Sequence, residues 1–351
     1  MAQMGISMRY GFSITVVAAA AAWLAAYPRP APAQQALPTI VPHPAWDCGM
    51  PDGIPQPERG NLIFEISLPL ERVVDIGTTQ YGERRVAIGL QGVVEGPELT
   101  ATVVEGALDL ELELSNGAIE IEQILVFETA DGSYILARNA GTGSDSNDIR
   151  VVMDFEAPND GAHAWLNSGS YVARRDLNRE GKTMRIHVYD VSGVSAGATQ
   201  AIHVSRPTHV PFQSWGYRKK ASGETQGEVL ITENVTLAPS QRVGPSKRGP
   251  RNIIPITGGQ LSGRINGKVL MGGADYQNLT PPATIDARYL WQTDDGEIIV
   301  VRNGGEFGSL VPTFETRVDG PYAFLNDGLY LSSNPGPGQG GVALIFYDST
   351  N

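Results

Sequence analysis

The chain contains one sequence pattern twice, and this repeat limits the folds that it can adopt. The segment FETADGSYILARNAG at 127–141 aligns without a gap with WQTDDGEIIVVRNGG at 291–305. A pattern this long that occurs twice indicates two copies of one domain rather than a solenoid. Further matches follow in the same order and pair Ile76–Arg84 with Val243–Arg251, Glu105–Asp109 with Met271–Asp275, Asp160–Tyr171 with Asp319–Tyr330, and His187–Asp190 with Ile345–Asp348.

Each copy shows the alternation of a β-strand that ends in a tight turn. In Thr284–Thr293 the apolar residues alternate with polar ones, Asp295-Gly296 supplies the turn, and Glu297–Arg302 returns as a second strand. The first copy repeats this pattern around Asp131-Gly132. With 41 glycines and no amphipathic helix after the N-terminal stretch, the pattern predicts an all-β chain. We expect two tandem antiparallel β-barrels rather than sandwiches, because closure removes exposed sheet edges.

The first 33 residues have the organisation of an export signal. Arg9 precedes the apolar stretch Ile14–Ala26, which is short for a membrane span, and Ala31-Pro32-Ala33 forms a small-residue cleavage site. An uncleaved membrane anchor is the alternative, and the prolines that follow the apolar stretch disfavour it. We therefore expect cleavage after Ala33 and a periplasmic or secreted protein that is not inserted in a membrane.

The net charge and the single cysteine limit the partners and cross-links that we expect of this chain. A net charge of −12 argues against nucleic acid as a partner. The single cysteine, Cys48, cannot form an internal disulfide. We expect a monomer whose two halves imitate a dimer.

The predicted segments are a signal peptide at 1–33, a Pro/Gly-rich tether at 34–60, a divergent first barrel at 61–193, a linker at 194–226 and a second barrel at 227–351.

The Asp-Gly turns lead to a hypothesis about a buried arginine. If Asp295-Gly296 is a two-residue loop, Arg302 projects from the face that carries Tyr289 and Trp291. The same count places Arg138 beside Leu125 and Phe127. A buried cation needs a carboxylate or an anionic ligand. The candidate carboxylates occur in both copies and are Asp109 and Glu156 in the first and Asp275 and Glu315 in the second.

Differences between the copies favour a site in the second barrel. The second copy has paired glycines at 258–259 and 272–273, where the first copy has bulkier residues such as Leu90, Gln91 and Leu108. Paired glycines let backbone amides approach a ligand, or simply make tight barrel corners. The arginine cluster has a structural alternative too, since it could fix the register of the barrel. The candidates are Glu315 and Asp275 for catalysis, Arg302, Tyr276, Asn326, Tyr289 and Trp291 for ligand binding, and Asp109, Arg138, Glu156 and Asn167 as their equivalents in the first copy.

Several familiar sites are missing from the sequence. The five histidines have no metal-ligand spacing, and no nucleophile elbow, phosphate-binding loop or dinucleotide fingerprint occurs. We therefore expect neither a metal nor a cofactor.

The second half resembles a known family in an ordered set of motifs. The segments RNIIPITGGQLSG, VLMGGADY, DARYLWQTDDGEIIVVRNGG, PTFET and YAFLN resemble domain-of-unknown-function family 3237, also called uncharacterised protein family 0311. The first half resembles it more loosely, through VDIGTTQYGERR, ARNAG, FEAPND and AWLN. The resemblance implies a compact antiparallel β-barrel, which is usually present as a single copy. It implies no agreed activity.

Three classes of function agree with these observations. The first is an exported β-barrel that binds an unidentified small molecule. The second is a cofactor-free isomerase, lyase or cyclase, with Glu315 or Asp275 as proton acceptor and Arg302, Tyr276 or Asn326 stabilising an oxyanion. The third is a non-catalytic structural or interaction protein. The sequence leaves open whether the chain is an enzyme, and a carboxylate that faces an open cavity, rather than one locked to an arginine, would favour catalysis.

Overall fold

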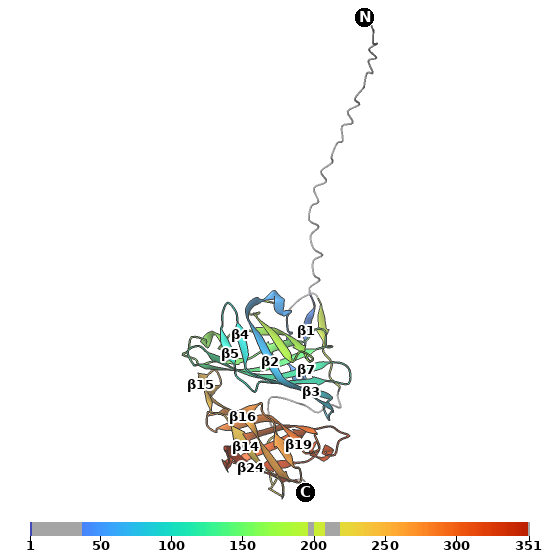
Figure 1. Ribbon diagram of the computed structural model, residues 1–351, viewed down its shortest axis with the longest axis vertical. Coiled ribbons are helices and arrows are strands. Elements are labelled where there is room, and N and C mark those ends of the chain that lie inside the picture. The colour runs from blue at the N-terminus through green and yellow to red at the C-terminus, as the bar shows by residue number, and fades with distance from the viewer. Residues whose placement is uncertain (2–36, 196–199, 208–217, 350–351) are drawn as a thin grey trace. The chain divides into compact units, whose positions relative to one another are not determined.

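The computed structural model describes residues 1, 37–195, 200–207 and 218–349. The predicted signal peptide and its cleavage site therefore lie outside the described residues. From Leu37 onwards the chain forms one compact unit. This unit is built from β-strands and four short 3-10 turns, so the all-β prediction is confirmed (Figure 1).

The first half closes into a barrel of antiparallel strands. The ladders run β8-β9-β11-β12-β2-β3-β6-β7 and return to β8, so eight strands form a ring. The short strands β4 and β5 extend β3 and β6 and pair with β2 and β7. The strands are β2 (Asn61–Thr78), β3 (Glu83–Gly89), β4 (Gly92–Glu95), β5 (Ala101–Val103), β6 (Leu108–Glu113), β7 (Ile119–Thr129), β8 (Tyr134–Gly143), β9 (Arg150–Met153), β10 (Phe155–Glu156), β11 (Tyr171–Asn178) and β12 (Thr183–Asp190).

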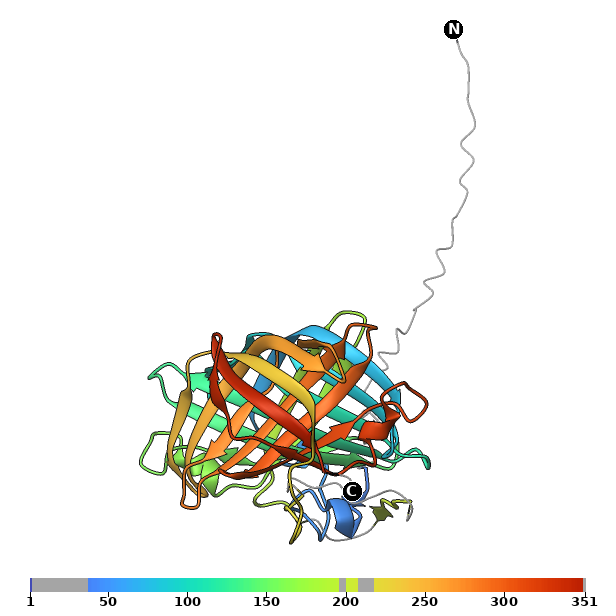
Figure 2. The same ribbon diagram turned by 90° about the horizontal axis from the view of Figure 1, so that it is seen from below.

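The second half forms a corresponding antiparallel sheet. Its order is β21-β20-β19-β17-β16-β14-β24-β22, and the end strands β21 and β22 contact one another. These twisted strands appear in orange and red in Figure 2. The strands are β14 (Glu228–Leu237), β15 (Gln241–Ser246), β16 (Gly249–Gly263), β17 (Gly267–Val269), β18 (Ala274–Asn278), β19 (Thr284–Thr293), β20 (Ile298–Glu306), β21 (Ser309–Glu315), β22 (Tyr330–Ser332), β23 (Gly336–Gly338) and β24 (Gly341–Asp348).

Each half has its own apolar core inside its sheet. In the first, Phe64, Phe127 and Phe155 are fully buried and pack edge to face or tilted at centroid separations of about 6 Å. In the second, Trp291 is fully buried and packs on Phe314 and Phe346. The inward direction of Trp291 follows from strand alternation, as the sequence predicts.

The segment before the first barrel is folded from Leu37 on, rather than an extended tether. Strand β1 (Thr39–Val41) pairs in parallel with β13 (Ala201–His203), which comes from the expected linker. Trp46, in the turn η1 (Pro44–Trp46), is buried and donates its indole N–H to the Gly141 carbonyl at 2.8 Å. The sequence did not show this, because a Pro/Gly-rich segment has no periodic pattern to read.

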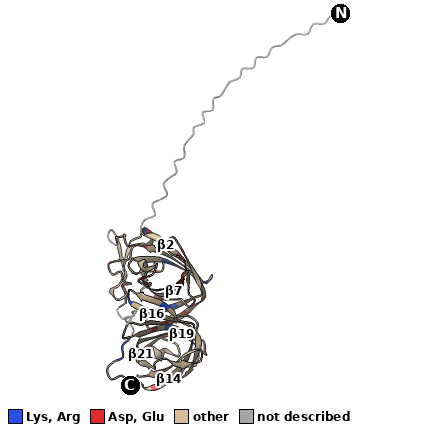
Figure 3. Cartoon of the chain, turned by 90° about the vertical axis from the view of Figure 1, so that its left-hand side faces the viewer, with Lys and Arg blue, Asp and Glu red and all other residues tan. Residues whose placement is uncertain are grey.

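The outer faces of the two barrels pack on each other through two apolar clusters. In the first, Val86 and Leu108 of the first half meet Leu290 and Val300 of the second. The other cluster brings Ile124, Val126 and Leu136 of the first half against Val243, Ile253, Ala274 and Tyr276 of the second. Charged residues also occur on β7 and β19, where Arg288 pairs with Glu122 (residue types are coloured in Figure 3).

Candidate functional site

The two Asp-Gly hairpins have loops of three residues, not two. The Thr293 amide donates to the Glu297 carbonyl at 2.9 Å, and Arg288 stands opposite Arg302 in the β19–β20 ladder. Gly296 has φ +95°, which only a residue tolerant of the left-handed region adopts easily. Since side chains alternate along a strand, the extra residue moves Arg302 to the opposite face. The prediction that Arg302 points into the aromatic inner wall is wrong.

The same shift applies to the first barrel. There the Thr129 amide donates to the Ser133 carbonyl at 3.0 Å, and Ile124 stands opposite Arg138. Arg138 therefore shares the outer face with Ile124 and Val126, not the inner face with Leu125 and Phe127. Both arginines lie between the barrels or at the rim of their contact.

Four of the predicted ligand and catalytic residues belong to this contact or to a turn. Arg302 lies 3.7 Å from Glu122 of the first barrel, and among the described residues the predicted salt bridge with Glu315 or Asp275 is absent. Glu315 instead accepts hydrogen bonds from Arg84 at 2.9 Å and from Thr79 at 2.6 Å. Tyr276 is buried in the apolar contact between the barrels.

Asn326 has a local structural role. Its side chain donates to the Thr316 carbonyl and accepts from the Thr316 amide, each at 3.0 Å. Asn167 makes the same pair of bonds with Ala157 at 2.8 Å. The repetition of Asn326 and Asn167 in both copies therefore reflects one conserved turn geometry within this chain, and neither side chain reaches the lumen pocket described below.

The paired glycines serve backbone packing. Gly273 has φ +74°, its amide donates to the Gly106 carbonyl of the first barrel at 2.7 Å, and an added Cβ would lie 1.9 Å from the Arg288 carbonyl oxygen. An added Cβ at Gly259 would lie 2.2 Å from the Asn234 carbonyl oxygen. These positions exclude side chains because strands approach closely there, which is the corner alternative of the sequence analysis.

The remaining predicted residues, Asp275, Tyr289 and Trp291, do lie inside the second barrel. Asp275 stands opposite Ala287, and Ala287 stands opposite Asn303, so the three form one inward row across β18, β19 and β20. The first barrel has the corresponding row Asp109, Gln123 and Asn139. The two rows differ at the middle position, where glutamine is replaced by alanine.

In the first barrel this row is closed by hydrogen bonds. Gln123 donates to Asp109 and Asn139 donates to Gln123, both at 2.9 Å. Arg175 binds both oxygens of Asp109 and, at 2.9 Å, Glu111. The Asp109 carboxylate is thus locked by a bidentate arginine, which leaves it a structural role.

In the second barrel the row is open. Asp275 Oδ2 accepts from Gln277 at 2.8 Å, while the buried Oδ1 has no hydrogen-bond partner. Asn303 donates to Ser332 at 3.1 Å, and its buried Oδ1 has no partner either. Among the described residues, no arginine or lysine forms a salt bridge with Asp275. Two buried acceptors without donors are unusual in a native interior and mark a place where a donor group is missing.

Both open acceptors line one apolar pocket, which we call the lumen pocket. Its free volume is 30 Å³. Burial raises the pKa of Asp275 to about 6, the nearby Asp286 carboxylate adds to this, and the hydrogen bond from Gln277 opposes it. The other lining residues are Val235, Leu237, Ile256, Ile285, Ala287, Tyr289, Leu310, Pro335, Val342 and Leu344.

A buried glutamate beside the lumen pocket was missed by the sequence analysis. Glu233 is fully buried and accepts from the Tyr289 hydroxyl at 2.8 Å and the Trp291 indole at 2.6 Å. Burial raises the pKa of Glu233 to about 7, against the effect of these two bonds. The first barrel has Leu125 and Phe127 in place of Tyr289 and Trp291. A comparison of the two copies could have shown that both hydrogen-bond donors to Glu233, Tyr289 and Trp291, occur in the second copy and not in the first.

Two further findings concern metal clusters and membrane-spanning helices among the described residues. Within the ranges that the structure describes, no group of three or more His, Cys, Asp or Glu side chains is arranged to hold a metal ion. No helix in the same ranges combines the length and apolar character needed to cross a membrane.

A model of a protein family of unknown function, DUF3237, matches residues 59–194 and again 226–309. The chain belongs to this family. UPF0311 proteins of Rhodopseudomonas palustris and Bradyrhizobium diazoefficiens are 48% identical over 85 residues and 47% identical over 64 residues; these matches cover 23% and 18% of this chain.

The chain spans about half the length of these curated relatives, with 54% and 42% matched. A β-barrel-like protein from Acinetobacter baumannii is similar in structure, with 21% identity and a TM-score of 0.32, over 37% of this chain and 94% of that one. The predicted membership of DUF3237, in two tandem copies, is confirmed.

Proposed function

We propose that the chain binds a small molecule in the lumen pocket of the second barrel. The observation that supports this is the pair of buried acceptors, Asp275 Oδ1 and Asn303 Oδ1, which have no partners at one apolar pocket. An unsatisfied buried polar group costs about 1–3 kcal/mol, so a ligand that donates to one of these acceptors recovers that free energy. Apolar walls with a few convergent polar groups are the usual composition of a ligand site.

The size of the lumen pocket limits how a ligand enters. A volume of 30 Å³ is about the share of one water molecule in the liquid, so only one hydroxyl, amine or amide group fits beside Asp275. The half-buried Leu237, Pro335 and Val342 form the outer part of the lining. The ligand class that matches this arrangement is a mostly apolar molecule with one donor group, whose apolar part rests on these outer residues.

Catalysis is the second candidate, and one observation favours it. The Asp275 carboxyl lies at a pocket without a salt bridge in the described chain, and burial raises its pKa to about 6. A carboxyl that titrates near neutral pH is suited to proton transfer. Of the residues considered for a cofactor-free isomerase, lyase or cyclase, Asp275 alone lines the lumen pocket, since Glu315, Arg302, Tyr276 and Asn326 lie elsewhere. We further propose that the protein is exported, on the strength of its N-terminal sequence.

The first barrel supplies the test. Ala287→Gln rebuilds the closed row, because glutamine at this position would donate to Asp275 as Gln123 donates to Asp109. Small phenols, alcohols and amines are screened by thermal shift, and each hit is titrated. We expect Ala287→Gln to abolish binding while the melting temperature is kept or raised. Ala343→Gln is the matched control, because Ala343 lies on the opposite face of β24 from Leu344.

Two results would contradict the proposal. The first is equal affinity of a hit for the wild type and Ala287→Gln. The second is the failure of every probe that carries a donor group to shift the melting temperature. For catalysis, a turnover found with any hit must be lost in Asp275→Asn while binding is kept.

A further inference from the structure

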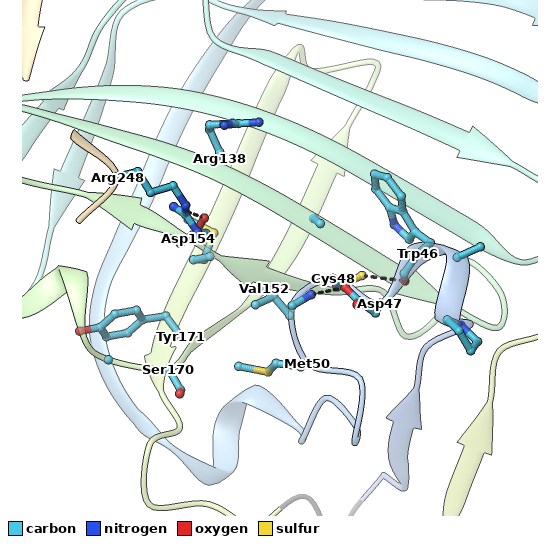
Figure 4. Close-up of a pocket in the computed structure, with 16 residues that line it drawn as sticks. Trp46, Asp47, Cys48, Met50, Arg138, Val152, Asp154, Ser170, Tyr171 and Arg248 are labelled. Atoms are coloured by element: carbon cyan, nitrogen blue, oxygen red, sulfur yellow. Dashed lines mark hydrogen bonds and ion pairs between the residues drawn. The ribbon is translucent and has the colours of Figure 1, made fainter. Parts of the chain in front are cut away.

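A second and larger hollow lies where residues 44–50 cover the first barrel. This junction cleft has a volume of 460 Å³, within the range of small-molecule sites. Figure 4 shows its walls, which come from three separate parts of the chain. Trp46 and Met50 come from the N-terminal segment, Arg138, Val152 and Asp154 from the first barrel, and Arg248 from the β15–β16 hairpin of the second.

One end of the junction cleft is rich in cations. Asp154 forms salt bridges with Lys247 and Arg248, both at 2.7 Å, and its backbone carbonyl accepts from the Arg138 amide at 2.9 Å. Two cationic side chains thus pair with this aspartate, and Arg138 is joined to it through the backbone. Of the other carboxylates, Glu156 is fully buried and held by Arg251, and Asp286 is 3.9 Å from Arg138. Asp47 lies at the far end, beside Cys48 (Figure 4).

The other wall is apolar and rigid. Trp46 is buried and fixed by its bond to the Gly141 carbonyl, and Val152 is buried in the outer face of the barrel. Met50 packs against the same cluster. A ligand with an apolar body would therefore find a preformed surface next to the cationic end.

The repeat provides a comparison site in the same molecule. The aligned positions of Arg138, Asp154 and Arg248 are Arg302, Thr313 and Tyr81, and these also line one hollow. That hollow has a volume of 30 Å³, against 460 Å³ at the junction cleft. Tyr81 stands at this hollow in place of an arginine, and the neighbouring Gln80 donates to the Asn326 carbonyl at 3.4 Å. Of the two equivalent hollows, one is small and lined by a tyrosine, and the other is large and lined by an arginine.

We propose that the junction cleft binds a small organic carboxylate with an apolar body. Guanidinium groups present paired donors that match a planar carboxylate, and Arg138 and Arg248 both face the cleft. Burial lowers the pKa of Arg138, the carboxylates of Asp286 and Glu156 oppose this effect, and Arg288 and Arg251 add to it. An anion bound beside Arg138 therefore stabilises the charged form of its guanidinium group.

The test uses the full chain and three carboxylates, benzoate, phenylacetate and hexanoate, titrated by calorimetry. Benzamide serves as the uncharged match of benzoate, and inorganic phosphate as an anion without an apolar body. We expect benzoate to bind at least about tenfold more tightly than benzamide or phosphate. Arg248→Tyr introduces the residue that lines the small equivalent hollow, and it should weaken benzoate binding by at least about tenfold.

Control variants separate this site from other effects. Arg242→Tyr changes an exposed arginine on β15 that does not line the cleft, and should leave benzoate binding unchanged. Asp275→Asn should also leave it unchanged, which distinguishes this site from the lumen pocket. If Arg248→Tyr unfolds, Met50→Trp fills the cleft without a change of charge and should give the same loss. Equal binding of benzoate and benzamide, unchanged binding in both filling variants, or no binding of the three carboxylates up to about 10 mM would overturn the proposal.

Discussion

The guanidinium of Arg84 in the first barrel lies 2.9 Å from the carboxylate of Glu315 in the second. Arg251 of the second barrel meets Glu156 of the first at 2.7 Å, and the repeat aligns Arg84 with Arg251 and Glu156 with Glu315. The two contacts are therefore the same contact made in opposite directions. Such self-complementary contacts are typical of a two-fold dimer, and they support the proposal that the halves of this chain imitate one.

Loss of Arg84 should destabilise the protein strongly. Arg84→Met leaves the buried Glu315 carboxylate without its cation, which costs roughly 3–5 kcal/mol. Urea unfolding measures the change in the free energy of unfolding. Arg72→Met is the control, because the Arg72–Glu71 pair is about one-third exposed and such pairs contribute roughly 0–1 kcal/mol. Equal losses in the two variants would show that the contact between the barrels is not energetically important.

The close approach at Gly273 predicts a large difference between two glycine substitutions. Gly273→Ala should cost several kcal/mol, because the new Cβ would lie 1.9 Å from a backbone oxygen and φ is +74°. Gly296→Ala adds a Cβ with no atom within 4 Å. Its cost is therefore only the strain of an alanine at positive φ, about 1–2 kcal/mol. Thermal unfolding of both variants measures the gap, and similar melting temperatures would contradict the packing argument.

Glu233 should make stability depend on pH. Its pKa of about 7 in the folded protein is raised above the ordinary value of 4.5, so its contribution is most favourable at low pH and is lost as pH rises through 7. Glu233→Gln keeps one acceptor for Trp291 and one donor for Tyr289, as the protonated acid does. We expect equal stability near pH 4 and a gain of roughly 3 kcal/mol for the variant at pH 9. Glu228→Gln, exposed on the same strand, should change little at either pH.

The position of Arg302 separates binding from stability. Arg302→Ala should lower the free energy of unfolding, by about 1–4 kcal/mol, since it removes a partly buried cation beside the buried Glu122. It should leave the affinity of any lumen ligand unchanged, because Arg302 lies on the outer face. Urea unfolding and ligand titration of the same variant test both statements. A loss of affinity for the lumen ligand with an unchanged free energy of unfolding would show that Arg302 belongs to the ligand site.

The N-terminal sequence predicts processing on export. The mature chain should begin at Gln34, because the small-residue site follows an apolar stretch of signal length. Mass spectrometry of exported protein measures the terminus. A terminus at Met1 or Met8 would contradict cleavage, and Ala31→Leu or Ala33→Leu should block it.

The sequence was sufficient for the strands and the duplication but not for which way the arginines point. The alternation around Tyr289 and Trp291 predicts their inward direction correctly, because the period of a strand is two. Asp-Gly occurs both in two-residue loops and in three-residue loops whose glycine is left-handed. A difference of one residue reverses every later side chain, so Arg302 was placed on the wrong face.

Glu233 shows a different limit. In the segment 228–237 a glutamate in a strand is read as solvent-facing, since charged residues are rarely buried without partners. Its two donors are 56 and 58 residues further along the chain, so the pairing depends on the closed sheet rather than on local pattern. Asp275 was identified from the repeat, but its open oxygen depends on the absence of a glutamine donor at Ala287, where the first copy has Gln123, and a strand pattern does not reveal this.

The different fates of Tyr81 and Arg248 have a consequence for how such a protein changes over time. In a dimer of identical chains, every substitution near the two-fold axis appears at both equivalent hollows. A substitution that improves one hollow therefore also changes the other. Fusion of the copies into one chain lets the two hollows change independently, because the residues of each hollow are then encoded separately. One can be filled to add stability while its counterpart acquires a ligand, and the duplication thereby permits a division of labour that an identical pair cannot reach.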